Sequence, residues 1–89
     1  HRRDPITGLG LSSGDFADLT RVVASYVPAG RKIFFLEGGY DLVALRDSVA
    51  ATMAALLDVS TRPEPATSDG PGATAVQAVA RIREQRGFG

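Results

Sequence analysis

Five consecutive residues, Leu36-Glu37-Gly38-Gly39-Tyr40, carry the strongest indication of chemistry in this sequence. A neutral phenol can donate a hydrogen bond to a developing oxyanion. The two glycines lack Cβ atoms, which leaves room for a substrate to approach the backbone beside the phenol. Tyr40 is therefore the leading candidate for a catalytic side chain. The alternative is an aromatic that fills space where a helix meets a sheet, with its hydroxyl bonded to a backbone carbonyl.

The segments on either side of this turn indicate how the tyrosine is positioned. Residues 33–36 are continuously apolar, which is the pattern of a strand covered on both faces in a parallel sheet. Because a helix is expected before the strand, the order is that of half a βαβ crossover. We therefore predict an α/β fold with one parallel-type strand, residues 32–36, flanked by helices. Tyr40 would then lie beyond the carboxyl end of the strand, where open α/β sheets bind ligands.

Both flanking helices are predicted from caps and from apolar spacing. Ser12 or Ser13 can cap the first helix and Asp41 the second. Each helix repeats apolar residues on one face that we expect to be core: Phe16, Leu19, Val22, Val23 and Tyr26 in the first, and Leu42, Leu45, Val49, Met53, Leu56 and Leu57 in the second. The alanines between these residues would let the second helix pack closely on a sheet or another helix.

Composition excludes several classes of function. The 89 residues carry ten basic and ten acidic side chains, and the basic ones are scattered, so neither a nucleic-acid partner nor an anionic membrane surface is expected. The sequence has no cysteine, which excludes disulfides and thiolate metal sites. No apolar run approaches the roughly 20 residues that span a bilayer. We expect a cytoplasmic protein, and the preference for arginine and alanine over lysine suggests a bacterial source.

The single predicted strand suggests that the chain is part of a longer fold. The sequence has no initiating methionine and opens with a polar stretch, so we expect a C-terminal fragment whose neighbouring strands lie upstream. Residues 1–58 would belong to the larger domain. Residues 59–72 are rich in Pro, Thr, Ser, Asp and Gly and are expected to form a linker. Residues 73–89 would be a tail, either a short amphipathic helix or a frayed end.

Two other kinds of site are weaker candidates. The Gly38-Gly39 turn precedes a helix N-terminus that could attract a phosphate, but Glu37 and Asp41 flank it, so a neutral polar group suits it better. His1, Asp4 and Asp15 are possible metal ligands by residue type, yet their spacing matches no dense ligand pattern, and no metal ligand is assigned in this chain.

Several motifs taken together resemble the zinc-dependent histone deacetylase family, in its class II, acetylpolyamine amidohydrolase or acetoin-utilisation form. They are Asp4-Pro5, Gly8-Leu9-Gly10-Leu11, Asp15-Phe16, Leu19-Thr20-Arg21 and Leu36-Glu37-Gly38-Gly39-Tyr40-Asp41-Leu42. The resemblance covers roughly residues 1–57 and would make residues 1–58 the C-terminal part of a deacetylase domain.

The resemblance implies an arginase-like α/β fold and hydrolysis of an acetyl-amide in an acetyl-lysine protein or a small acetylated amine. It implies that Tyr40 donates a hydrogen bond to the oxyanion and that Gly38 and Gly39 line the substrate channel. It also implies a zinc ion in the complete enzyme, with ligands upstream of His1, so that the fragment alone would be inactive. A non-catalytic α/β docking module, or a degenerate family member, is the alternative.

Overall fold

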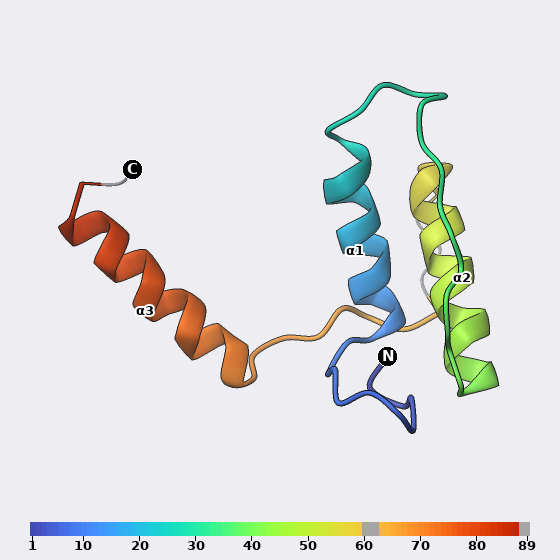
Figure 1. Ribbon diagram of the computed structural model, residues 1–89, viewed down its shortest axis with the longest axis horizontal. Helices are drawn as coiled ribbons and strands as arrows, with labels where there is room; N and C mark the ends of the chain where they lie inside the picture. The colour runs from blue at the N-terminus through green and yellow to red at the C-terminus, as the bar shows by residue number, and fades with distance from the viewer. Residues whose placement is uncertain (60–62, 88–89) are drawn as a thin grey trace.

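A computed structural model describes residues 1–59 and 63–87 of the chain. Three helices form in chain order: α1 Ser13–Ala24, α2 Leu42–Leu56 and α3 Pro71–Gln85 (Figure 1). No residue within the described ranges is in a β-strand. The predicted α/β class, with a parallel-type strand over residues 32–36 and an arginase-like arrangement, is therefore wrong for this structure, which is all-helical.

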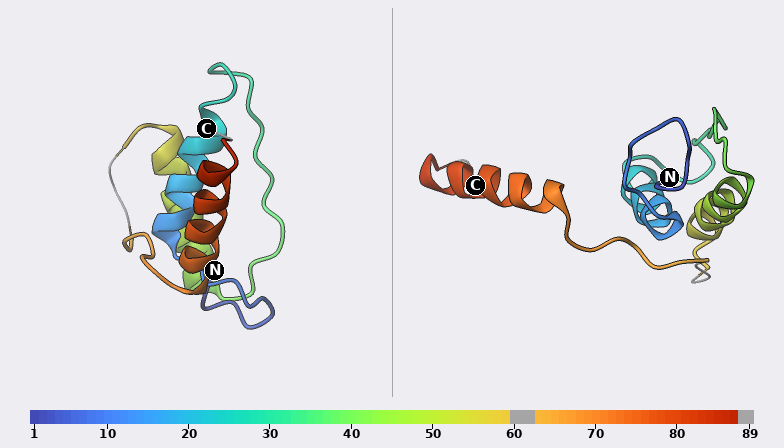
Figure 2. Two further views of the ribbon diagram at one scale, coloured as in Figure 1. Left: turned by 90° about the vertical axis from the view of Figure 1, so that its left-hand side faces the viewer. Right: turned by 90° about the horizontal axis from the view of Figure 1, so that it is seen from below.

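The segment predicted as a strand is an extended connection between the first two helices. Helices α1 and α2 lie side by side and run in the same direction, and residues 31–40 return along α2 from the end of α1 to the start of α2 (Figures 1 and 2). We call residues 31–40 the return segment. Its course determines where the Gly-Gly-Tyr turn lies, because the turn forms its last three residues.

The return segment is not a strand because a strand requires hydrogen bonds to a neighbour. Within the described residues, no second extended segment pairs with it. Its apolar side chains are consequently uncovered: Ile33 is 80% and Phe35 is 83% exposed. The apolar run indicates burial on both faces, but the described residues supply neither a pairing strand nor covering layers.

The predicted start of the first helix is confirmed in detail. Ser12 is the N-cap of α1, and its hydroxyl accepts a hydrogen bond from the Asp15 backbone N–H at 3.2 Å. The Asp15 carboxylate accepts one from the Ser12 N–H at 2.8 Å. This reciprocal capping box satisfies two N–H groups that the first turn of a helix leaves without partners.

The predicted start of the second helix is also confirmed. Asp41 is the N-cap of α2, and its carboxylate accepts a hydrogen bond from the Ala44 N–H at 2.8 Å. Replacing such a cap by alanine typically costs about 1 kcal/mol. The cap matters for the candidate site because it fixes the residue that directly follows Tyr40.

The faces that α1 and α2 turn toward each other are made of small residues. The buried positions, three or four residues apart, are Ala17 and Thr20 on α1 and Ala44, Ser48 and Ala51 on α2. Small side chains at helical spacing let two helices approach closely. The large apolar residues predicted as core lie mostly outside this contact, and Tyr26 is 79% exposed. The interpretation of Tyr26 as core is therefore wrong.

Helix α3 stands apart from the other two. Gly70, at φ +113°, precedes it, and Pro71 occupies its first turn. It contacts neither α1 nor α2 and projects away from them (Figure 2). Residues 60–62 of the predicted linker and 88–89 of the predicted tail lie outside the described residues. Among the described helices, none is long and apolar enough to cross a membrane.

Candidate functional site

The Gly-Gly-Tyr turn depends on two glycines in left-handed backbone conformations. Gly38 has φ +70° and Gly39 has φ +95°, a region that residues with a Cβ adopt at a cost. A Cβ on Gly39 would also lie 2.6 Å from Leu45 Cδ1. The turn thus needs glycine at Gly39 for its backbone conformation, and a methyl group there would also displace the side chain of Leu45.

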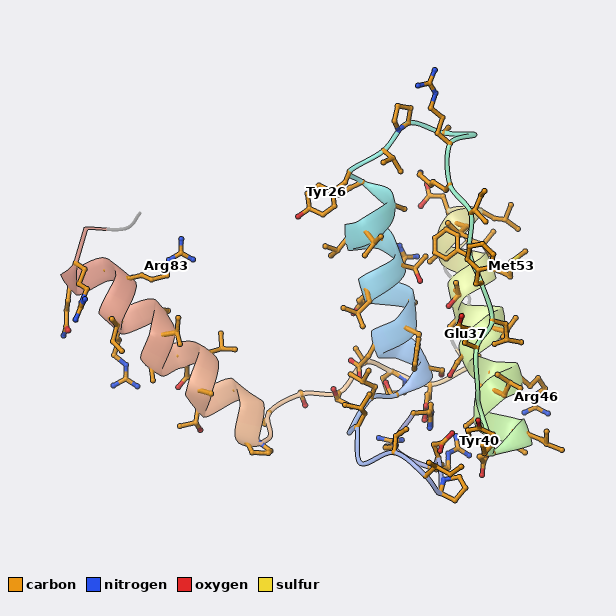
Figure 3. The ribbon with its side chains drawn as sticks, viewed as in Figure 1. Tyr26, Glu37, Tyr40, Arg46, Met53 and Arg83 are labelled. Atoms are coloured by element: carbon orange, nitrogen blue, oxygen red, sulfur yellow. The ribbon has the colours of Figure 1, made fainter. Side chains whose placement is uncertain are left out.

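The side chain of Tyr40 lies over the first of these glycines. A Cβ built on Gly38 would lie 3.6 Å from Tyr40 Cε2, so the ring is a close neighbour of the glycine backbone. Tyr40 is 61% exposed and lies at the start of α2 (Figure 3). None of the hydrogen bonds found among the described residues involves its hydroxyl. The phenol is therefore accessible and free to donate.

The backbone of Tyr40 is held by a residue from the other end of the sequence. The Tyr40 N–H donates to Asp4 Oδ2 at 3.0 Å, and the N–H groups of Ile6 and Thr7 donate to Asp4 Oδ1 at 2.9 and 3.3 Å. The bond from Tyr40, followed by that from Ile6, lowers the pKa of Asp4 below its ordinary value. The Asp-Pro loop and the Gly-Gly-Tyr turn, two motifs noted in the sequence, are thereby joined.

A groove of about 530 Å³ opens beside the turn, a volume within the usual range of small-molecule sites. Its walls come from α1, the return segment and α2, and they include Phe16, Phe34, Leu45 and Met53. Gly38 and Gly39 are part of the lining and Tyr40 is not. The two glycines predicted to contact substrate thus face a mainly apolar groove, and the phenol lies outside it.

The three residues considered as metal ligands do not converge. His1 contacts Glu64, Asp4 holds Tyr40, and Asp15 caps α1. Throughout the described residues there is no group of three or more His, Cys, Asp or Glu side chains placed to hold a metal ion. The residues described in this chain therefore do not fit a zinc site.

A second long-range cluster closes over the start of α1. Residues 64–67, which we call the strap, lie across its first turn. Glu64 accepts hydrogen bonds from the Ser13 N–H at 2.7 Å and from Arg2 at 2.8 Å, and His1 Nε2 lies 2.5 Å from its carboxylate. The bond from Ser13 lowers the pKa of Glu64 and outweighs the opposing effect of burial, with Arg2 and Arg3 adding to the lowering.

The rest of the strap is held by the capping residues of α1. Ser12 Oγ donates to the Pro65 carbonyl at 2.7 Å, and the Thr67 N–H and hydroxyl donate to Asp15 at 2.9 and 2.8 Å. Burial raises the pKa of Asp15, but the hydrogen bonds from Ser12 and Thr67 together lower it by more, so the net shift of this pKa is downward.

Neither the Asp4 contact nor the strap was anticipated from the sequence. An aspartate whose side chain can accept from the N–H groups two and three residues later is a local signal for a turn. This signal could have indicated the loop in which Ile6 and Thr7 donate to Asp4. No local signal reports the bonds to Tyr40 and Ser13, because they join residues 36 and 51 positions apart.

Comparisons with known proteins find relatives for part of the chain. Histone deacetylase 10, chloroplastic, from Oryza sativa subsp. japonica is 47% identical over 60 residues, and Histone deacetylase 14, chloroplastic, from Arabidopsis thaliana is 40% identical over 60 residues. Each match covers 64% of this chain and 14% of the relative. No known protein-family profile matches the chain, and no solved structure matches it significantly.

The chain thus spans about 14% of the length of each relative, and both relatives are named as chloroplastic plant proteins. The cytoplasmic location and the bacterial source remain predictions. The same holds for the class II type and for zinc dependence. What the two matches show is that part of this chain is similar to two histone deacetylases, at identities of 47% and 40% over 60 residues.

Proposed function

We propose that this chain is part of an amide hydrolase of the histone deacetylase type, in which Tyr40 donates a hydrogen bond to the oxyanion formed during cleavage of an acetyl-amide. The observation that carries the proposal is the glycine turn that holds an accessible phenol next to the cap of α2. The similarity to two histone deacetylases supplies the reaction class.

The chemistry assigned to Tyr40 follows from the hydrolysis of an amide. Attack of water on the acetyl carbonyl places negative charge on its oxygen, and a fixed O–H donor stabilises that charge more than it stabilises the neutral carbonyl. The substrate would be an acetyl-lysine side chain or a small acetylated amine. Zinc is proposed only for the complete enzyme, with ligands outside this chain.

The test is Tyr40→Phe in the complete gene product, assayed on an acetyl-lysine peptide and on an acetylated polyamine. Loss of one oxyanion donor should lower kcat by about 10² to 10³. Tyr26→Phe is the matched control, because it removes a hydroxyl from an exposed tyrosine near the other end of α1, away from Tyr40 (Figure 3). Wild-type turnover in Tyr40→Phe would refute the role of the phenol, and bound zinc should be measured on both variants.

The exposed apolar residues of the return segment favour a second candidate function. Ile33, Phe35 and Leu36 are all more than two-thirds exposed, which is typical of a surface that binds another protein element. A non-catalytic docking role would use this surface and leave Tyr40 without a chemical task. A complete gene product that binds no zinc and hydrolyses neither substrate would favour this second function.

A further inference from the structure

The carboxylate of Asp4 divides its two oxygens between two parts of the chain. Oδ1 accepts from the N–H groups of Ile6 and Thr7 and so closes its own loop. Oδ2 accepts from the N–H of Tyr40 at 3.0 Å. An ionised carboxylate can accept at both oxygens at once, whereas an amide side chain has only one acceptor oxygen.

The backbone of Tyr40 needs such an anchor because of what precedes it. Gly38 and Gly39 have the largest conformational freedom of any residue type. Asp41 fixes the chain on the other side by capping α2. Among the described residues, the Tyr40 N–H donates its hydrogen bond to Asp4. This bond restrains the backbone of Tyr40 directly after the two glycines.

We propose that Asp4 is a positioning residue that holds the Tyr40 backbone, and with it the phenol, where the oxyanion forms. This inference rests on the function proposed for Tyr40. Asp4 acts through the backbone of Tyr40, because its two carboxylate oxygens already accept from the N–H groups of Ile6, Thr7 and Tyr40. The Asp-Pro loop thus provides a carboxylate acceptor, and the flexible Gly-Gly-Tyr turn requires one to hold the N–H of Tyr40.

The test compares Asp4→Asn, Tyr40→Phe and the double variant in the complete gene product. A misplacement of about 1 Å can cost about 10²-fold in rate, so Asp4→Asn should lower kcat by about 10- to 100-fold with little change in KM. Because Asp4 acts through the phenol, Asp4→Asn should have little further effect in the Tyr40→Phe background. Asp18→Asn, which makes the same charge change at a surface position on α1, should retain wild-type kcat.

The outcomes separate the two proposals. If Tyr40→Phe retains wild-type kcat, the function proposed for Tyr40 fails and the role of Asp4 fails with it. If Tyr40→Phe is impaired but Asp4→Asn is not, or if the two losses multiply in the double variant, only the positioning role is overturned.

A folding defect is handled by a second substitution. Asp4→Ser keeps an acceptor oxygen for its own loop but is too short to reach Tyr40. Like Asp4→Asn, it should lower kcat when Tyr40 is present and have little further effect in the Tyr40→Phe background. If neither Asp4→Asn nor Asp4→Ser folds, as judged by circular dichroism, Asp4 serves the fold as a whole and the positioning proposal is overturned.

Discussion

The carboxylate of Glu64 lies 2.7 Å from the backbone nitrogen of Ser13, so a segment that follows α2 closes over the first turn of α1. The first N–H groups of a helix have no partners within it and attract anions. The strap meets this need with a carboxylate from a distant part of the chain, and the basic side chains of Arg2 and Arg3 compensate its charge.

Removing this carboxylate should loosen the strap. A hydrogen bond to a charged group contributes about 1.5 to 3 kcal/mol, so Glu64→Ala should raise the amide exchange rate of the strap and of the first turn of α1 by at least about tenfold. Hydrogen–deuterium exchange of the complete gene product measures this directly. Glu84→Ala on α3, an exposed position, is the control; equal protection in wild type and Glu64→Ala would contradict the role of Glu64.

Gly14 should not tolerate a methyl group, although it lies in a helix. Alanine is favoured over glycine in helices by about 1 kcal/mol, but a Cβ on Gly14 would lie 2.3 Å from the Ala66 nitrogen and 2.4 Å from the Pro65 carbonyl carbon. Because both atoms are backbone, the strap must move. Gly14→Ala should therefore increase amide exchange in the strap.

Gly72→Ala provides the opposite case. It makes the same change on α3, where a Cβ meets nothing within 4 Å, and it should increase the protection of α3 slightly. A Gly14→Ala variant with unchanged exchange in the strap would show that the strap adjusts without cost.

Gly39→Ala separates conformational strain from steric clash at the turn. The clash with Leu45 Cδ1 involves the end of a flexible side chain, so it can be relieved, whereas φ +95° cannot be adopted cheaply by alanine. Gly39→Ala should lower deacetylase kcat, and adding Leu45→Ala should restore little of it. Gly8→Ala, at an open position, should retain wild-type kcat. Full rescue by Leu45→Ala would assign the defect to the clash instead.

Acid should weaken the strap. The pKa of Glu64 lies below its ordinary value of 4.5 when folded, so its stabilising contribution is complete above that value and is lost as pH falls through the lowered pKa. Asp15 has the same sign of shift. The melting temperature of the complete gene product should therefore fall as the pH drops below the ordinary pKa of 4.5, and Glu64→Gln should flatten that fall. An identical pH dependence in Glu64→Gln would exclude Glu64 as a source of it.

The 89-residue chain alone should unfold without a sharp transition. Its buried hydrophobic residues, among those described, are Ala17, Ala44 and Ala51, and three alanines bury little apolar area. Thermal melting followed by circular dichroism should be broad, and the chain should bind a hydrophobic dye such as ANS. A cooperative melting transition without dye binding would contradict this expectation.

The features that could be predicted from sequence are those set by neighbouring residues. Ser12 and Asp15 form a capping box within four positions. Asp41 caps α2 by accepting a hydrogen bond from the N–H of Ala44, three residues later. Such contacts require only local geometry, which is why both helix starts are correct. The consecutive glycines Gly38 and Gly39 likewise indicate a turn from local sequence alone.

The features that could not be predicted depend on distant partners. The apolar run at residues 33–36 indicates burial, but a strand also needs a paired neighbour, and the described chain provides none. The contact between α1 and α2 uses small residues in place of the large apolar ones, because close approach excludes bulky side chains. The bonds of Asp4 and Glu64 join segments that no sequence periodicity relates.

The parallel course of α1 and α2 also organises charge along the molecule. Each helix dipole places roughly half a positive charge at its N-terminus, and here both N-termini lie at the same end (Figure 1). At that end the carboxylates of Asp15, Asp41 and Glu64 accept hydrogen bonds from backbone N–H groups, and Arg2 and Arg3 offset the charge of Glu64. Tyr40, which directly precedes the N-cap of α2, therefore lies beside the positive backbone pole that α1 and α2 share.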